Sequence, residues 1–157
     1  MRKLKIYLDT SFISHLHQLD ASDKMSESLA LWKDIIAGDY DAVISEITTR
    51  ELMNALEPKR SIIAGFLGDA KFEELPITEA VDELAYEIIK RGILTVKSLD
   101  DCAHIAIAIL NNCDIIVSWN FKHLVNIKTI NGIREIVVSH RYKPIDIYSP
   151  TMFLKGD

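Results

Sequence analysis

Two spacings of hydrophobic residues alternate along the chain, and they predict strands and helices in turn. Short apolar runs bounded by polar residues predict strands over residues 5–8, 40–45 and 114–118. Residues 72–76 and 145–148 are candidates for two further strands, the second of them at an edge of the sheet. The run at 114–118 is apolar at each interior position, which is typical of a parallel strand with both faces buried.

Between these strands, hydrophobic residues recur every three or four positions, which predicts helices with one apolar face. We expect a helix over residues 46–57, with Ser45 as its N-cap. A second helix is expected between Thr78 and Gly92. The helix that follows Ser98 is apolar nearly all round, so we expect it to be buried between other elements.

The alternation of strands and helices predicts an α/β fold, in which a central, mainly parallel sheet of four or five strands has helices on both faces. No internal repeat, low-complexity tract or Pro/Gly-rich linker divides the 157 residues. We therefore expect a single domain over residues 1–157, in which residues 151–157 form a tail.

The composition changes this picture little but narrows the class of protein. Hydrophobic residues make up 48% and charged residues 26%, which fits a globular domain and not a disordered or disulfide-rich chain. No run of eighteen apolar residues predicts a membrane span, and the apolar segment after the basic N-terminus ends at Asp9, too early for a signal peptide. The only cysteines, Cys102 and Cys113, lack metal-ligand spacing. We expect a cytoplasmic protein that does not bind a membrane.

The charge is unevenly distributed along the chain. The net charge of -5 counts against a surface that coats nucleic acid. Residues 1–120 carry 12 Lys/Arg against 20 Asp/Glu, a net charge of -8, whereas residues 121–157 carry 6 against 3, a net charge of +3. The C-terminal part is therefore the candidate region for contacts with phosphates.

Four polar residues stand where ligands bind in open α/β sheets, near the carboxyl ends of strands. Asp9 follows the first strand, and Asn120 follows the strand at 114–118. Asp101 lies in the first turn of the buried helix, and Glu51 lies on the helix after the second strand. Each residue alone has a structural explanation as a cap, a helix-terminal charge or an exposed side chain. Their combination predicts a site.

Taken in order, these residues resemble the motifs of the PIN-domain family, the small nucleases that include the VapC-type toxins of toxin–antitoxin pairs. The resemblance extends over about residues 4–150. Four segments carry it: residues 6–11 (IYLDTS), 45–52 (SEITTREL), 101–108 (DCAHIAIA) and 114–123 (DIIVSWNFKH).

The resemblance implies that Asp9, Glu51 and Asp101 are metal-binding catalytic carboxylates of an endoribonuclease. Nucleases of this type often have a fourth acid where this chain has Asn120, so the resemblance places an amide in the same pocket.

Two neighbours of the acids are secondary candidates. Ser11 is a candidate donor to a carboxylate or to a water on the metal. Asp100 is a second acid beside Asp101, but its side chain points about 100° away from that of Asp101 on a helix.

Three converging carboxylates repel one another, and a divalent cation relieves this repulsion more cheaply than protonation. Oxygen ligands select Mg²⁺ or Mn²⁺ over zinc. Such a cation neutralises a phosphodiester oxygen and activates a water for in-line attack. The resemblance implies cleavage of RNA that leaves a 5′-phosphate and a 3′-hydroxyl. Because Asn120 is uncharged, we expect one well-held ion and a second that arrives only with substrate.

Basic and aromatic residues near Asn120 are candidates for contacts with RNA. Lys122 and His123 are favoured because they follow Asn120 directly. Further basic candidates are Lys128, Arg134, His140, Arg141 and Lys143. Trp119 and Phe121 are candidates for stacking on a base, although core packing is the default for both.

The resemblance also implies protein partners, namely an antitoxin or a second copy in a homodimer. Residues 12–19 and the helix at 29–36 carry apolar side chains that a toxin of this class uses for such contacts, but the default expectation for them is core. His104 has apolar neighbours, so we expect a packed histidine and not a ligand.

Two other functions stay open at this point. In a haloacid-dehalogenase-like phosphatase, Asp9 would be the nucleophile and Asp100 and Asp101 a metal pair, but Ser11 stands where that family has a second acid. A PIN-like module that only binds RNA or protein is the other alternative, with Asn120 as the mark of lost activity. An assay for metal-dependent RNA cleavage, run beside a generic phosphatase substrate, separates the three.

Overall fold

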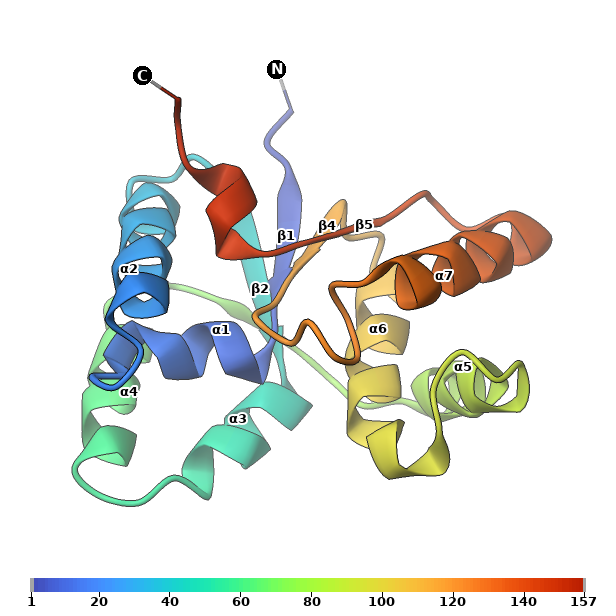
Figure 1. The fold of residues 1–157 in the computed structure, drawn as a ribbon, viewed down its shortest axis with the longest axis horizontal. Coiled ribbons are helices and arrows are strands. Elements are labelled where there is room, and N and C mark those ends of the chain that lie inside the picture. Colours follow the sequence, from blue (N-terminus) through green and yellow to red (C-terminus); the bar gives the residue numbers. More distant parts are fainter. Residues whose placement is uncertain (1, 157) are drawn as a thin grey trace.

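A five-stranded parallel sheet runs through the computed structural model, which describes residues 2–156 (Figure 1). The strands are β1 (Lys5–Leu8), β2 (Asp41–Ser45), β3 (Glu73–Leu75), β4 (Ile115–Val117) and β5 (Asp146–Tyr148). They lie in the order β3-β2-β1-β4-β5, and each neighbouring pair is parallel. The predicted α/β fold is confirmed, including both candidate strands and the position of the last one at an edge.

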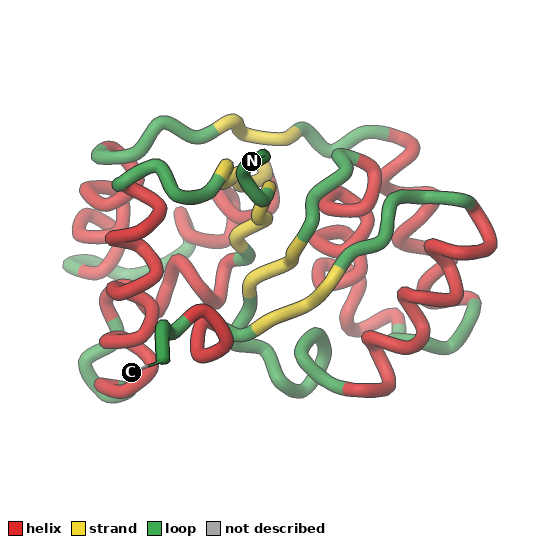
Figure 2. The backbone as a smooth tube through the Cα atoms, turned by 90° about the horizontal axis from the view of Figure 1, so that it is seen from above, coloured by secondary structure: helices red, strands yellow, loops and turns green. Residues whose placement is uncertain are grey.

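Helices cover both faces of this sheet, as the view from above shows (Figure 2). The helices are α1 (Thr10–Ser14), α2 (Ser22–Ile36), α3 (Glu46–Met53), α4 (Lys59–Gly68), α5 (Glu79–Lys90), α6 (Leu99–Leu110) and α7 (Ile127–His140). Three short 3-10 helices complete the structure: η1 (His15–His17), η2 (Val96–Ser98) and η3 (Pro150–Phe153). The side chains of α1, α2 and α4 join the core on one face, and those of α5, α6 and α7 join the core on the other.

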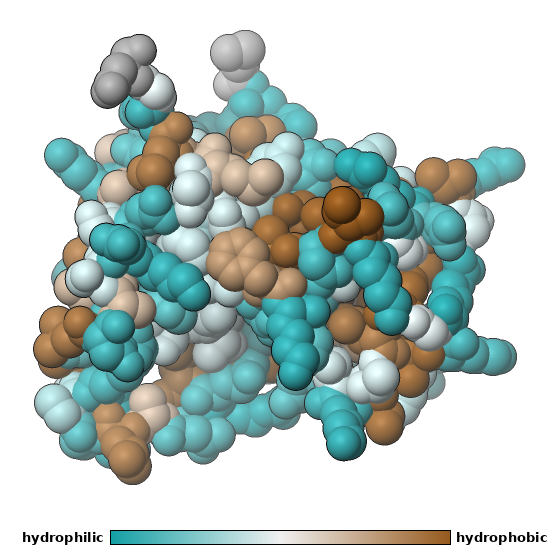
Figure 3. Space-filling model, in the orientation of Figure 1, coloured by the Kyte–Doolittle hydropathy of each residue, from teal (hydrophilic) through white to brown (hydrophobic). Residues whose placement is uncertain are grey.

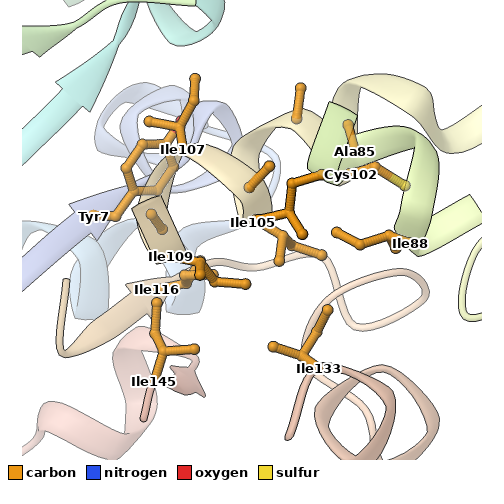
Figure 4. Packing of buried hydrophobic residues seen from close by; sticks show 14 of the residues in the cluster. Tyr7, Ala85, Ile88, Cys102, Ile105, Ile107, Ile109, Ile116, Ile133 and Ile145 are labelled. Carbon is orange, nitrogen blue, oxygen red and sulfur yellow. The ribbon is translucent and has the colours of Figure 1, made fainter. Parts of the chain in front are cut away.

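The alternation of side chains along β1 shows how the sheet divides the core. Ile6 and Leu8 point into the cluster beneath α1, α2 and α4, whereas Tyr7 points into the cluster beneath α5, α6 and α7. Figure 4 shows Tyr7 beside Ile107 of α6, with Ile116 of β4 close by. The last three residues of β1, Ile6, Tyr7 and Leu8, are fully buried, which explains why the strand is apolar on both faces.

The order of the strands places a crevice between β1 and β4. From β1 the chain passes to β2 and β3 on one side, and later to β4 and β5 on the other. The connections after β1 and β4 therefore turn to opposite faces, and ligands bind in α/β sheets at such a switch point, beyond the carboxyl ends of the strands. Asp9 and Asn120 follow these two strands.

Helix α3 is shorter than the sequence predicted. It ends at Met53, with Asn54 as its C-cap, and not at Glu57. Leu56, which lies within the range expected to be helical, is exposed. Asn is a poor helix former, and Pro58 disfavours helical backbone at the residue before it, so the helix stops early.

Helices α4 and α7 were not predicted. The middle of α7 contains Asn131 and Gly132, a dipeptide that is typical of turns. In the structure a Cβ atom on Gly132 would lie 2.6 Å from Cγ1 of Ile93, so the glycine allows α7 to approach the loop after α5. The basic C-terminal part is thus a packed helix and strand, and the expected tail begins with η3, where Phe153 packs on Tyr40 and Tyr148.

The surface mixes hydrophilic and hydrophobic side chains. On the face that Figure 3 shows, the largest hydrophobic group lies near the centre, in the region of β5 and α7, with hydrophilic side chains around it. Among residues 2–156, no helix combines the length and the apolarity that a membrane span requires.

Candidate active site

An open cavity of about 340 Å³ lies at the carboxyl edge of the sheet, beside the crevice between β1 and β4. Its lining comes from α1, η1, α3, α6 and the segments that follow β1 and β4: Asp9, Thr10, Ser11, Ser14, His15, Glu51, Asp101, His104 and Asn120. The structure therefore brings the four main candidates of the sequence analysis, and Ser11 with them, to one place.

Asp9 is a buried carboxylate that caps helix α1. Its Oδ1 accepts hydrogen bonds from the backbone N–H of Phe12 (2.9 Å) and from Ser11 Oγ (2.7 Å). Its Oδ2 accepts one from Ser118 Oγ (2.5 Å). Burial raises the pKa of Asp9 above its usual value, although the nearby His104 and these hydrogen bonds act against the rise. Only 3% of the residue is exposed, so its charge is held by neutral donors with little help from water.

Ser11 ties the loop after β4 to the first acid. Besides donating to Asp9, its Oγ accepts the backbone N–H of Trp119 at 2.9 Å. Ser118 Oγ likewise accepts the backbone N–H of Asn120 at 2.9 Å. The two hydroxyls therefore hold the ends of β1 and β4 at a fixed spacing around Asp9.

Glu51 enters the cavity from the second turn of α3. Its Oε1 accepts hydrogen bonds from Thr10 Oγ1 (2.9 Å) and His104 Nε2 (2.7 Å). Partial burial raises the pKa of Glu51, but the His104 and Thr10 hydrogen bonds outweigh it, so the pKa lies below its usual value. Glu51 is thus held as an ionised carboxylate at the rim.

Asp101 lies in the first turn of α6, opposite Asn120. His123 Nδ1 is 2.9 Å from its Oδ2, and Asn120 Nδ2 lies 3.4 and 3.5 Å from its two oxygens. Asn120 Oδ1 also accepts the backbone N–H of His123 at 3.0 Å, which is the capping role expected for an Asn at the start of this turn. Lys122 is exposed beside them.

Several residues that contact the acids or line the cavity were not predicted from the sequence, and His104 and Tyr7, which were also missed as parts of the site, are hydrogen-bonded to each other. His104 is packed and 2% exposed, as expected, but its ring also contacts Glu51. Tyr7 is fully buried, and its hydroxyl lies 2.5 Å from His104 Nδ1 and 2.7 Å from Ser45 Oγ. The sequence held two signals: His104 stands three residues after Asp101, on the same face of the helix, and a tyrosine in a doubly buried strand needs a partner for its hydroxyl.

Other candidates lie away from the cavity. The Asp100 side chain is 66% exposed and lies 3.8 Å from Arg50, so it points away from Asp101 as the helical geometry predicted. Lys143 pairs with Asp114, directly before β4, at the opposite edge of the sheet (2.7 Å). Arg141 follows α7 at the end far from Asn120.

Three further basic candidates lie on α7. Lys128 and Arg134 are exposed, and His140 contacts Glu87 of α5 at 2.8 Å. Of the basic residues named from the sequence, His123 is therefore the one that contacts an acid of the cavity, and the exposed Lys122 precedes it in the chain.

The apolar residues considered for a protein partner are mostly core. Inward-facing side chains of η1 and α2, such as Leu16 and Leu31, are buried beneath the sheet face. Leu19 and Ile36 are exposed, at 73% and 47%. Trp119 is buried as well, and its indole N–H donates to Ser28 Oγ at 2.7 Å.

The donor set fits a divalent cation that keeps part of its hydration shell. The cavity presents carboxylate oxygens from Asp9, Glu51 and Asp101 and an amide from Asn120, the ligand chemistry that Mg²⁺ and Mn²⁺ prefer. Within residues 2–156, no three His, Cys, Asp or Glu side chains are already arranged to hold a metal ion. The carboxylates line one cavity but do not converge directly, and each is hydrogen-bonded to a group of the chain. Mg²⁺ retains several waters and uses one or two carboxylates with substrate phosphates, so such a spacing suits it.

Comparison with known proteins shows the family of the chain and a structure of similar fold. No curated protein sequence matches the chain. A solved structure of VapBC2 from Rickettsia felis, bound to a DNA fragment from its promoter, contains a chain of similar fold, with a TM-score of 0.58 and 15% sequence identity. The match covers 93% of this chain and 98% of that chain. The family model described as PIN domain matches residues 6–122. The chain therefore belongs to the PIN-domain family, whose members are nucleases.

Proposed function

We propose that the protein is a metal-dependent endoribonuclease that hydrolyses RNA phosphodiester bonds. The observation that carries the proposal is the single cavity in which Asp9, Glu51, Asp101 and Asn120 meet, although they come from four separate parts of the chain. Membership of the PIN-domain family supports nuclease chemistry and not the phosphatase alternative.

The acids take different parts in this proposal. Asp9 and Asp101 would hold the cation, and Glu51, which stays ionised at the rim, would bind the cation directly or through its waters. A bound Mg²⁺ or Mn²⁺ supplies positive charge for the phosphodiester and acidity for the attacking water. Asn120 and His123 keep Asp101 in place, and Ser11 and Ser118 do the same for Asp9.

The surface beside the acids suits a single-stranded RNA. Phe121 is 48% exposed, directly after Asn120. Lys24 Nζ lies 5.6 Å from the ring centroids of both Phe121 and Trp119. The exposed side chain of Lys122 adds a second positive charge, besides that of Lys24. Exposed aromatic rings next to basic side chains bind single strands by stacking and by charge.

A cleavage assay with matched variants tests the proposal. Purified protein with Mn²⁺ or Mg²⁺ should cut a labelled single-stranded RNA, and EDTA should stop the reaction. Asp101→Asn should lose the activity, whereas Asp100→Asn, the same change one residue earlier on an exposed side chain, should keep it. Hydrolysis of a phosphomonoester, or RNA binding without cleavage in all conditions, would contradict the proposal.

A second apolar region, formed by residues that do not line the cavity, supports a toxin–antitoxin role. The chain of similar fold belongs to VapBC2 of Rickettsia felis. Leu19 and Leu56 are exposed at 73% and 84%, and Gln18 and Lys59, which lie near them in the chain, share a hydrogen bond. We infer that an antitoxin covers this apolar region. Expression of the chain should arrest bacterial growth, Asp101→Asn should not, and co-expression of the protein encoded beside it should restore growth; arrest by the Asn variant would contradict the inference.

A further inference from the structure

A continuous chain of hydrogen bonds leads from the core of the protein to Glu51. Ser45 Oγ lies 2.7 Å from the Tyr7 hydroxyl, which lies 2.5 Å from His104 Nδ1. His104 Nε2 lies 2.7 Å from Glu51 Oε1. Ser45, Tyr7 and His104 are 0%, 0% and 2% exposed, so water does not compete for the inner bonds.

The end of this chain has a defined direction. An ionised Glu51 only accepts hydrogen bonds, so His104 Nε2 must carry a proton, whichever protonation state the ring has. The Tyr7 hydroxyl holds the other ring nitrogen, and Ser45 holds the Tyr7 hydroxyl. The Tyr7 hydroxyl therefore fixes the rotation of the His104 imidazole from the core side. The fixed imidazole in turn determines that Oε1 is the Glu51 oxygen that accepts its hydrogen bond.

Packing alone does not require these polar groups. Tyr7 lies in a cluster of apolar side chains, and Figure 4 shows it beside Ile107 and near Ile116. Apolar residues of the same volume at positions 7 and 104 would fill the space without any polar atom to satisfy. The buried chain of hydrogen bonds ends at Glu51, the one carboxylate of α3 in the cavity. Its presence is explained if it holds that carboxylate in a fixed position.

We propose that Tyr7 is a positioning residue of the active site, which acts through His104 to fix Glu51 and leave its second oxygen for the cation. This inference rests on the proposed function in one respect, the place of Glu51 in the cation-binding set. Partners that orient metal ligands from behind commonly change metal affinity or activity by about 10- to 100-fold when they are removed.

The variant Tyr7→Phe removes the hydroxyl and keeps the ring. We expect Mn²⁺ affinity, measured by calorimetry without RNA, to fall about tenfold, and kcat to fall with little change in the KM for RNA. In wild-type protein without metal, NMR of ¹⁵N-labelled histidine should show a slowly exchanging proton on His104 Nε2, and this proton should exchange faster in Tyr7→Phe. Tyr40→Phe is the matched control, since Tyr40 lies directly before β2, at the opposite edge of the sheet, and all three measurements should stay unchanged.

A second pair of variants tests the same chain without touching Tyr7. His104→Gln can still donate an amide N–H toward Glu51, so it should retain more Mn²⁺ affinity than His104→Leu. Equal loss in both variants would overturn the proposal. So would unchanged Mn²⁺ affinity in a folded Tyr7→Phe, or a wild-type His104 whose Nε2 carries no proton, a result that needs no variant to fold. If wild-type protein fails to cut RNA while Tyr7→Phe still weakens Mn²⁺ binding, the proposed function fails and the positioning role stands.

Discussion

Two aspartates at opposite edges of the same sheet are stabilised in different ways. Asp114, directly before β4, accepts hydrogen bonds from Arg2 (2.9 and 3.2 Å) and pairs with Lys143 (2.7 Å). The hydrogen bond from Arg2, with those from Lys143 and the Lys5 backbone, holds the pKa of Asp114 well below its usual range. Asp9, directly after β1, has neutral donors, and burial raises its pKa.

The difference distinguishes a carboxylate that the chain neutralises itself from one that, in the proposed function, holds a cation. At the amino edge, where the strands begin, Arg2 and Lys143 already neutralise the charge of Asp114. Asp114 also accepts the backbone N–H of Lys5 and so ties the start of β4 to the start of β1. At the carboxyl edge, three acids lie around one cavity, with no lysine or arginine in its lining. A carboxylate site with no lysine or arginine of its own is suited to a cation from solution.

Removal of the charge at Asp9 is the strongest test of this comparison. Asp9→Asn keeps the shape and the cap of α1 but removes a charge that is costly to bury. We expect RNA cleavage to fall by at least about 10³-fold while the melting temperature without metal stays the same or rises. Mn²⁺ should raise the melting temperature of wild-type protein and not that of the variant. Unfolding of Asp9→Asn at room temperature would show that Asp9 is structural after all.

The same substitution at the other edge should do the reverse. Asp114→Asn removes the charge that Arg2 and Lys143 bind, so we expect a loss of about 2 kcal/mol in the free energy of unfolding and unchanged RNA cleavage per folded molecule. The figure is modest because 64% of the Arg2 side chain and 35% of the Lys143 side chain are exposed to solvent. Urea unfolding at pH 7 measures the change, and an Asp114→Asn variant as stable as wild type would contradict it.

Acid should reduce this difference. Because the pKa of Asp114 is lowered by folding, its contribution is complete above the unfolded value of about 4 and is lost as the pH falls toward the folded pKa. Wild type and Asp114→Asn should therefore converge in stability below pH 4. A gap between the two that is constant from pH 7 to pH 3 would rule out the ion pairs as its cause.

The two edges also differ in how far the sequence predicts them. That Asp9, Glu51 and Asp101 would lie near one another could be predicted, because apolar periods mark strand ends and helix starts and the family motifs share their order. Asp114 was not found as an ion-pair centre, since its partners Arg2 and Lys143 come from distant parts of the chain and no local pattern joins them. Tyr7 and Gly132 were missed for the same reason: a hydroxyl partner or a close helix approach exists only in three dimensions.

Asn120 offers a test with a smaller expected effect at the carboxyl edge of the sheet. In Asn120→Asp one carboxylate oxygen can still accept the backbone N–H of His123. The other oxygen would lie about where Nδ2 now lies, near 3.4 Å from the Asp101 carboxylate. The added charge should tighten Mn²⁺ binding by about threefold to tenfold and favour a second ion in calorimetric titrations. Wild-type protein should bind one ion tightly; two sites of equal affinity in wild type would contradict the role given to Asn120.

The smallest expected effect concerns the RNA itself, and it compares two lysines. Lys122 follows Asn120 and is exposed at the carboxyl edge of the sheet, whereas Lys143 is bound to Asp114 at the amino edge. Lys122→Ala should weaken the binding of single-stranded RNA a few-fold. The slope of log affinity against log salt concentration should fall in magnitude by about 0.7, the contribution of one phosphate contact. Lys143→Ala should leave the RNA affinity and the salt slope unchanged. The Lys143 ammonium already pairs with Asp114, which lies at the other end of β4 from the acids. A salt slope that responds equally to both lysines would mean that RNA contacts the whole C-terminal part, and the distinction between the two edges would then hold for the metal but not for the substrate.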